Sequence, residues 1–353
     1  MKRIRAGILA TVSLVGACVL PFSTAAAAPA VREVTTTIQA AVDAAPPGST
    51  IVIPRGRYHE AVTIDKSGLT LRAAPGAVLD GGGSLVDGLR VVAPAGQRIN
   101  QFVLAGLTVQ NFTRFGVYLR DVDNYRITGT VTRDILVDGL FPVRTSNGRI
   151  DHTVSTGSKD TGLYIGQSTN VTLDHNIDVG NTIGIDVEVS DGVIATNNLA
   201  TGNAIGAIAQ VVPGLGRTTT NGTVFRGNVF SGNNAQNPST DPQDLLSQLP
   251  GGVGLLTVAT ANTEIQDNVV VDNRTVGIAV VQLPAVVAAL DPRIDPLPRQ
   301  VRVLSNLIFD NGWMPDPNYV PLSGNAVWDG SGSGNCWSGN QPVTAALSAL
   351  PAC

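Results

Sequence analysis

The chain has 353 residues, of which 43% are hydrophobic and only 5% aromatic, so it can bury a large core built mainly from aliphatic side chains. Its formal net charge of -4 at pH 7 gives no basic surface, which argues against nucleic acid as a partner. The sequence also contains no motif for a zinc site, a phosphate-binding loop or a dinucleotide-binding turn.

Residues 1–28 have the layout of a secretory signal peptide. A basic start precedes an apolar run over residues 6–22 and a series of small residues, which predicts cleavage near Ala27 or Ala28. No later stretch reaches the roughly 20 apolar residues of a membrane span. We therefore expect a secreted or extracytoplasmic protein with no transmembrane segment in the mature chain. The alternative is a lipoprotein signal in which Cys18 carries the lipid anchor.

A short amphipathic helix is predicted directly after this segment. Thr36 and Gln39 have the spacing of a capping box, and a Pro-Pro-Gly sequence at residues 46–48 ends the pattern. Apolar side chains recur with helical spacing at Ile38, Ala41, Val42 and Ala45. Strand segments follow at residues 50–54, 61–64, 69–71 and 77–79. We expect the helix to cover the exposed strand edges at the start of the fold.

The rest of the chain repeats a unit of 22 or 23 residues, interrupted by insertions. A glycine opens one strand of each unit, at Gly116, Gly139, Gly162, Gly184, Gly206, Gly254 and Gly277. Asparagines five residues apart follow other strands, at Asn176/Asn181, Asn198/Asn203, Asn228/Asn233, Asn268/Asn273 and Asn306/Asn311. Such units are typical of a parallel β-helix, whose equivalent residues stack about 4.8 Å apart. We interpret the asparagines as hydrogen-bonded ladders at tight turns, rather than as ligands.

Two parts of the sequence resemble known β-helix proteins. TIQAAVDAAPPGSTIVIPRGRYHEAVTI, residues 37–64, resembles the opening of secreted proteins with the pectin-lyase-like fold. GLYIGQSTNVTLDHN, GIDVEVS and NNLATGN, between residues 162 and 203, resemble exported parallel β-helix repeat proteins. The resemblance spans most of residues 36–312 and implies an all-β, right-handed parallel β-helix (a solenoid) with a short N-terminal capping helix. It leaves function open, because the superfold includes pectate lyases, polygalacturonases, alginate epimerases and carbohydrate-surface proteins.

We accordingly divide the chain into a signal peptide (1–28), a β-helix with its helical cap (31–335) and a C-terminal tail (336–353). Ordinary signal cleavage leaves two cysteines, Cys336 and Cys353. In an exported protein these are expected to form a disulfide that fixes the tail to the end of the coil.

The glycine-opened strands predict which side chains face outward. Their second and fourth residues are apolar and should point into the coil, so the third and fifth should point out. In chain order the outward pairs are Tyr118/Arg120, Phe141/Val143, Tyr164/Gly166, Asp186/Glu188, Ile208/Gln210, Leu256/Val258 and Ala279/Val281. The later pairs are largely apolar and need a cover. We expect the insertions at residues 212–221, 236–252 and 283–298 to fold over them and to form one wall of a groove.

Asp186 and Glu188 are the first candidate site. Two residues apart on one strand, they leave the same face roughly 6 to 7 Å apart at the backbone. Such a pair suits acid/base glycoside hydrolysis or a Ca²⁺ ion, and the alternative is a solvated acidic patch. The substrate-binding candidates are Tyr118, Arg120, Phe141, Arg144, Lys159, Asp160 and Tyr164. Among these, the aromatic rings suit sugars, and Arg144 and Lys159 are expected to approach the groove and could neutralise a uronate.

A second candidate site combines Asp151, His152, Asp174 and His175. The two Asp-His pairs are 23 residues apart, which predicts stacking on successive turns. They could form an acid/base pair or a metal site, and the alternative is a stacked surface ladder. Alginate epimerases carry Asp and His in a strand motif, but their DPHD pattern is absent, since this chain has IDHT and LDHN.

These observations predict a monomer that binds a polysaccharide along its first parallel sheet. We favour an enzyme, either a polysaccharide lyase or a glycoside hydrolase, over binding alone. The competing hypothesis is a non-catalytic interaction scaffold at the cell surface or in the periplasm. Ca²⁺ is the only cofactor that the residues suggest, and the identity of any metal stays open.

Overall fold

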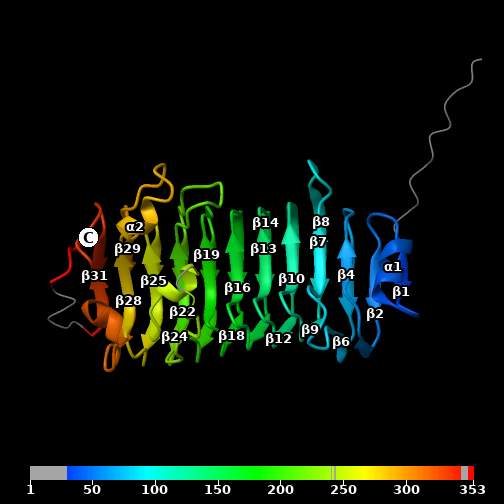
Figure 1. Cartoon of the computed structure of the whole chain (residues 1–353), viewed down its shortest axis with the longest axis horizontal. Coiled ribbons are helices and arrows are strands. Elements are labelled where there is room, and N and C mark those ends of the chain that lie inside the picture. Colours follow the sequence, from blue (N-terminus) through cyan, green and yellow to red (C-terminus); the bar gives the residue numbers. More distant parts are fainter. Residues whose placement is uncertain (1–29, 240, 242–243, 343–348) are drawn as a thin grey trace, which may run out of the picture.

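The chain winds into one long coil of parallel strands (Figure 1). The computed structural model describes residues 30–239, 241, 244–342 and 349–353. The predicted signal peptide and Cys18 lie outside the described residues. Within them the strands form three parallel sheets of 12, 10 and 10 strands, called here sheets A, C and B, and each complete turn contributes one strand to each sheet. The right-handed parallel β-helix predicted from the sequence is confirmed.

Sheet A contains β1 (Val31–Glu33), β2 (Thr50–Ile53), β5 (Thr70–Ala73), β8 (Ile99–Ala105), β11 (Val122–Thr128), β14 (Ser146–Asp151), β17 (Thr169–Asp174), β20 (Ile194–Thr196), β23 (Val224–Arg226), β26 (Glu264–Gln266), β29 (Arg302–Leu304) and β32 (Cys336–Ser338). Sheet B contains β3 (Gly56–Tyr58), β6 (Ala77–Asp80), β9 (Thr108–Gln110), β12 (Val131–Arg133), β15 (Val154–Thr156), β18 (Ile177–Val179), β21 (Leu199–Thr201), β24 (Val229–Ser231), β27 (Val269–Val271) and β30 (Leu307–Phe309).

Sheet C contains β4 (Val62–Ile64), β7 (Leu89–Val92), β10 (Phe115–Arg120), β13 (Asp138–Val143), β16 (Thr161–Gly166), β19 (Ile183–Glu188), β22 (Ile205–Gln210), β25 (Val253–Val258), β28 (Val276–Val281) and β31 (Gly324–Trp328). The helices are α1 (Ile38–Ala44), α2 (Ala285–Ala288) and two 3₁₀ segments, η1 (Leu245–Gln248) and η2 (Pro317–Leu322). No helix in the described residues has the length and hydropathy needed to cross a membrane.

The interior of the coil is filled by the side chains that the sequence pattern directed inward. On β19, for example, Ile185 and Val187 are completely buried. The same holds on neighbouring strands of sheet C for Val117, Leu119, Leu163, Ile165, Ala207, Ala209, Leu255, Ile278 and Val280. Parallel pairing places Leu163 beside Ile185 and Tyr164 beside Asp186, so residues with the same role stack along the coil. The predicted strand parity is therefore confirmed.

The asparagines form two ladders inside the turns. In the first, each side-chain amide donates to the Oδ1 of the next asparagine at 2.9 Å, through Asn176, Asn198, Asn228, Asn268, Asn306 and Asn340. The second runs through Asn181, Asn203, Asn233, Asn273, Asn311 and Asn325. Because these buried amides are satisfied by their neighbours, their role is structural, as predicted. The last member of each ladder, Asn340 or Asn325, was not recognised in the sequence.

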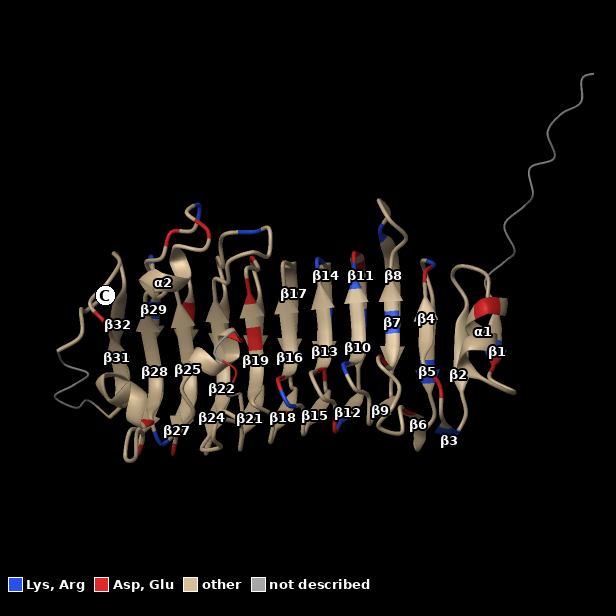
Figure 2. Cartoon of the chain, in the orientation of Figure 1, with Lys and Arg blue, Asp and Glu red and all other residues tan. Residues whose placement is uncertain are grey.

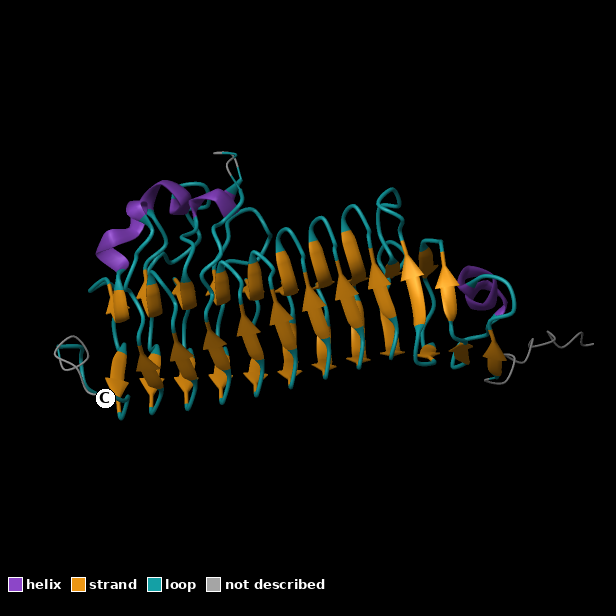
Figure 3. Cartoon of the chain, turned by 90° about the horizontal axis from the view of Figure 1, so that it is seen from below, coloured by secondary structure: helices purple, strands orange, loops and turns teal. Residues whose placement is uncertain are grey.

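Helix α1 covers the N-terminal end of the coil (Figure 3), with Ile38 and Val42 buried. The predicted capping box is wrong. The N-cap is Thr37, whose hydroxyl accepts from the backbone N–H of Ala40 at 3.1 Å. The side chain of Gln39 does not accept from the N–H groups of the first helical turn. Glu60 from the following turn of the coil does so instead, accepting from the N–H groups of Ile38 and Gln39 at 2.7 and 3.0 Å. A carboxylate from the following turn thus supplements the local Thr37 cap.

A second hydrophobic core lies on the outer face of sheet C. Outward side chains of β22 to β28, such as Ile208 and Leu256, pack with residues of the three insertions. The insertions contribute Leu215, Leu246, Leu249, Leu283 and Ile294. Figure 3 shows α2 and the 3₁₀ helices gathered on one side of the later turns. The expectation that the insertions cover the apolar outward positions is confirmed.

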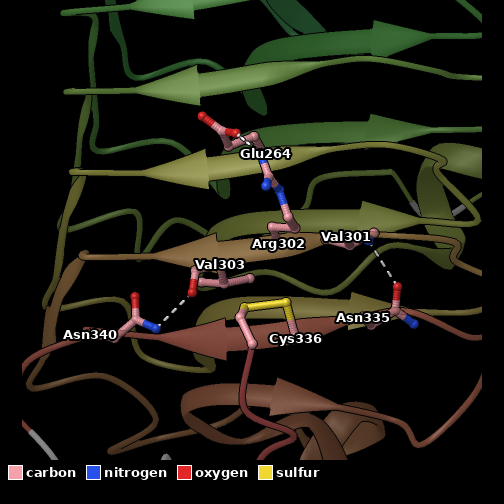
Figure 4. The surroundings of a disulfide bond; sticks show 8 residues. Glu264, Val301, Arg302, Val303, Asn335, Cys336 and Asn340 are labelled. Carbon is pink, nitrogen blue, oxygen red and sulfur yellow. Dashed lines mark hydrogen bonds and ion pairs between the residues drawn. A yellow bond between two sulfur atoms is a disulfide. The ribbon is translucent and has the colours of Figure 1, made fainter.

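The predicted pairing of Cys336 with Cys353 is present as a disulfide (Figure 4). Cys336 belongs to β32, the last strand of sheet A, and Trp337 beside it pairs with Ala352 in a parallel bridge. Asn335 and Asn340, at either end of this strand, bond to the backbone of Val301 and Val303 in the preceding turn. The disulfide therefore joins the end of the tail to the last turn of the coil.

Candidate active site

Four carboxyl groups from three successive turns gather on the outer face of sheet C. Asp186 and Glu188 face outward from β19 because Ile185 and Val187 occupy the interior. Figure 2 shows these acidic positions along β19. Asp138 is the first residue of β13, and Asp160 directly precedes β16. We call these four residues the carboxylate cluster.

Hydrogen bonds connect Asp186 and Glu188 to the neighbouring turns. The Tyr164 hydroxyl donates to Glu188 Oε2 at 2.8 Å. The Gln210 amide donates to Glu188 Oε1 at 3.0 Å and lies 3.3 and 3.4 Å from the two oxygens of Asp186. Asp138 accepts from the backbone N–H of Thr161 at 2.9 Å. Within the described residues, none of the four carboxylates forms an ion pair with Lys, Arg or His.

Burial without a cation makes these carboxyl groups hard to ionise. Asp186 is only 3% exposed, so the interpretation as a solvated acidic patch is wrong. Burial, together with the neighbouring carboxylates, raises the pKa of Asp186 and of Asp138 well above the usual range. Burial also raises the pKa of Asp160 to about 6 and that of Glu188 to about 7. Protonated and ionised carboxyl groups therefore coexist in one site near neutral pH.

The cluster lines a cavity of about 400 Å³, within the range of ligand pockets. Its lining combines sheet C with the insertions and η2. The residues are Asp138, Phe141, Asp160, Thr161, Tyr164, Ile183, Asp186, Glu188, Gln210, Val211, Val212, Pro213, Asp244, Leu245, Leu246, Gln248, Leu249, Pro250, Leu256, Val258, Val281, Gln282, Leu283, Pro284, Val287, Tyr319, Leu322 and Asp329. Among the described residues, this lining contains no Lys, Arg or His.

A row of aromatic rings leads to the cluster from the N-terminal side. Phe141 stacks on Tyr164 with ring centroids 4.5 Å apart and on Phe115 at 4.1 Å. Tyr118 lies 5.6 Å from Phe141. Arg90 lies over the Tyr118 ring and Arg114 over the Phe115 ring. Apart from Tyr164, which is buried, these rings are half-buried and present apolar surface of the kind on which sugar rings stack.

The predicted convergence of Arg144 and Lys159 on this groove is wrong. Arg144 follows the C-terminal end of β13, while Lys159 comes before the N-terminal end of β16. In a parallel sheet these two ends lie on opposite sides, so the two residues are far apart across sheet C. Arg144 forms a two-pronged ion pair with Asp121, and Lys159 is exposed. Arg120 approaches the same Asp121 at 3.5 Å. None of the three cations lines the cavity, whereas Asp160 does.

Sequence reasoning missed Asp138, Gln210 and Phe115. Asp138 and Phe115 immediately precede the strand-opening glycines, and parallel pairing aligns them with each other. Tabulating that position along the repeat would have found both. Gln210 was placed correctly as outward, but its contact with Asp186 and Glu188 depends on a side chain that reaches back to the previous turn.

The second candidate site is stacked as predicted. Asp151 pairs in register with Asp174, and the rings of His152 and His175 stack 5.3 Å apart. Asp151 is completely buried between Arg126 and Arg149, at 3.0 and 2.6 Å. Although burial opposes it, hydrogen bonds from Arg126, Thr128 and Arg149 hold the pKa of Asp151 well below its usual range.

The pKa of Asp174 is also lowered. Burial again opposes ionisation, but hydrogen bonds from Asn197, His175 and Thr196 lower the pKa of Asp174 to about 2. Both aspartates are thus ionised and saturated with partners at neutral pH, which supports the interpretation as a surface ladder. In the part of the chain that the structure describes, no group of three or more His, Cys, Asp or Glu side chains is arranged to hold a metal ion. We therefore derive no step through a metal, and Ca²⁺ stays a prediction.

Residues 97–288 match the family described as the right handed beta helix region. The curated proteins contain no match to the chain. Among solved structures, the A-module of mannuronan C-5 epimerase AlgE4 from Azotobacter vinelandii is 18% identical, with a TM-score of 0.64 over 86% of this chain and 82% of that one. The periplasmic alginate epimerase AlgG is 15% identical, with a TM-score of 0.62 over 84% and 71%. An alginate lyase from Paenibacillus sp. str. FPU-7 is 15% identical, with a TM-score of 0.50 over 88% and 98%. At these identities the likeness shows the fold alone.

Proposed function

We propose, since the chain belongs to the right-handed β-helix family, that its carboxylate cluster is the active site of an exported enzyme that hydrolyses a polysaccharide. The polysaccharide-acting β-helix enzymes among its structural neighbours support this substrate class. The observation that carries the proposal is four carboxyl groups without a cationic partner, held in one cavity beside a row of aromatic rings.

The chemistry follows from the unequal pKa values. Glu188, with a pKa of about 7, can still hold a proton near neutral pH and donates it to the glycosidic oxygen as the bond to the anomeric carbon breaks. Asp160, with a pKa of about 6, is mainly ionised and takes a proton from the water whose oxygen attacks that carbon. Tyr164 and Gln210 hold the Glu188 carboxyl in place.

Hydrolysis fits the site better than a lyase or epimerase reaction on a uronate. Those reactions bring a substrate carboxylate into the site, where a cation or metal must neutralise it. Here the described lining residues include several carboxyl groups and no Lys, Arg or His, so no side chain of the lining offers a positive charge to a uronate, and the ionised member of the cluster, Asp160, opposes its binding. A neutral sugar that stacks on Phe141 and Tyr164 suffers no such repulsion.

Binding without catalysis is the second candidate function. The half-buried rings of Phe115, Tyr118 and Phe141 favour it, because a scaffold needs such a platform but needs no unpaired carboxyl groups. Export and a monomeric state belong to the proposal as well. Export is supported by the Cys336–Cys353 disulfide and by the signal-like start of the chain.

The test is a panel of neutral and acidic polysaccharides, assayed for new reducing ends and for unsaturated products, with added Ca²⁺ and with a chelator. We expect reducing ends from a neutral polymer. Glu188→Gln should lower turnover by at least roughly a hundredfold, as expected on loss of a general acid. The matched control is Glu264→Gln, which removes a charge on sheet A outside the cavity and should retain activity. Unsaturated products, or full activity in Glu188→Gln, would contradict the proposal.

A further inference from the structure

The cavity has two unlike halves along the coil. The part of its lining that belongs to sheet C comes from six successive strands, β13 to β28. The carboxylate cluster and Tyr164 occupy the half over β13 to β19. The half over β25 and β28 is lined by aliphatic side chains of the sheet and of the insertions, among them Leu256, Leu283 and Leu249.

Two acidic residues of the lining outside the carboxylate cluster, Asp244 and Asp329, are already used by the protein. Asp244, whose charge contributes to the raised pKa of Asp160, caps η1, accepting from the Leu246 N–H at 3.0 Å and from the Ser239 hydroxyl at 2.7 Å. Asp329 accepts from the backbone N–H groups of Gln282 and Ser331 at 2.8 and 2.9 Å. Their oxygens therefore hold loops in place.

A sugar ring would be poorly accommodated in this half. Each hydroxyl group would exchange its hydrogen bonds to water for contacts with aliphatic carbon, which costs free energy. Transfer of an alkyl, acyl or aryl group from water to the same surface would instead be favourable. The two halves are continuous, so one ligand can occupy both.

We propose that the substrate is an amphiphilic saccharide, in which an apolar substituent lies in the aliphatic half while the sugar meets the carboxylate cluster. The proposal rests on the function proposed above for the cluster and narrows its substrate class. The apolar group is an alkyl or acyl chain or an aryl ring attached close to the scissile bond. A sugar without such a group leaves the aliphatic half without a matching partner.

The test compares methyl β-D-glucopyranoside with n-octyl β-D-glucopyranoside, measured by calorimetry below the micelle concentration of the octyl compound. The sugar is the same, so the difference reports the alkyl chain. Each fully buried methylene strengthens binding roughly three- to fourfold. We therefore expect one octyl glucoside per chain, bound at least tenfold more tightly than methyl glucoside.

Two leucines give a matched pair of variants. Leu249 lines the cavity and is partly buried, whereas Leu290 lies in another insertion, is 69% exposed and does not line it. Leu249→Asn should abolish most of the octyl preference, and Leu290→Asn should keep it, with circular dichroism verifying the fold of both. Equal affinity for the two glucosides overturns the proposal. So does an octyl preference that survives Leu249→Asn.

The outcome also separates this proposal from the proposed function. Glu188→Gln should retain the octyl preference, because it changes only the polar half of the cavity. Turnover of a polysaccharide without any octyl preference would contradict the amphiphilic substrate and leave hydrolysis standing. An octyl preference without turnover of any saccharide would contradict hydrolysis and leave the apolar subsite standing.

Discussion

Two outer faces of the same coil carry aspartate and glutamate side chains whose pKa values are shifted in opposite directions. On sheet A, Asp151, Asp174 and Glu264 each have arginine partners, and hydrogen bonds lower their pKa values. On sheet C, Asp186 and Glu188 have no cation, and burial raises their pKa values. The residue types are the same on both faces. The difference shows that the neighbouring cations and the cover of a group of carboxyl side chains decide whether their pKa values fall or rise.

The largest expected effect is an opposite response of the two faces to the same substitution. At pH 8, Glu188→Gln should increase the free energy of unfolding by about 3 kcal/mol at most, because the raised pKa of Glu188 destabilises the folded chain once both states ionise. Glu264→Gln should instead decrease it by about 1 kcal/mol or less, since hydrogen bonds from Arg226, and then from Arg302, lower the pKa of Glu264. Thermal unfolding measured at pH 8 tests both signs. Shifts of equal sign would remove the contrast.

The second prediction concerns the pH range of this effect. Asp160 and Glu188 have folded pKa values of about 6 and about 7, above the ordinary values of 3.8 and 4.5. A raised pKa gives stability that is fully present below the unfolded pKa and is lost as the pH rises to the folded pKa. The cluster should therefore lower the melting temperature between about pH 4 and pH 7, by a few degrees for a chain of this size. Asp174, with a pKa of about 2, acts in the opposite direction and only at acid pH.

This pH trend should be smaller in Glu188→Gln and unchanged in Glu264→Gln between pH 5 and pH 8. Melting curves of both variants across that range provide the control. A wild-type melting temperature that rises steadily from pH 4 to pH 7 would mean that the cluster is ionised in the folded chain.

The third prediction adds a cation to the cluster. Gln210→Arg places a guanidinium beside Asp186 and Glu188, which imitates sheet A and should lower the pKa of Glu188. The alkaline limb of the rate profile should then move to lower pH, because Glu188 loses its proton earlier. A fall of one pKa unit reduces the protonated fraction at pH 8 by nearly tenfold. Gln210→Met is the control without a charge. Identical alkaline limbs in wild type and Gln210→Arg would exclude Glu188 as the proton donor.

The sequence was sufficient to predict the coil because each turn repeats the same short sequence pattern. The glycine spacing, the asparagine pairs and the strand parity each recur, so Asp186 and Glu188 could be placed outward without a structure. Their pKa values could not be predicted in this way, since these depend on insertions that follow no repeat. The incorrect placement of Arg144 has a related cause. Whether a turn residue faces a groove is decided by partners such as Asp121, more than 20 residues away in the chain.

The smallest expected effect concerns the hydroxyl group of Tyr164. It donates to Glu188 Oε2, and this hydrogen bond partly offsets the rise in the pKa of Glu188 caused by burial. Tyr164→Phe should therefore raise that pKa slightly further and move the alkaline limb of the rate profile to higher pH by less than about one unit. The ring stacked on Phe141 is kept, so affinity for a sugar should change little, whereas Tyr164→Ala removes the ring and should weaken binding. Rate profiles and affinities of the two variants separate the roles of the hydroxyl and the ring. If Tyr164→Phe moves the alkaline limb to lower pH, the hydroxyl does not stabilise the ionised form of Glu188, and the proton donor must be assigned to another member of the cluster.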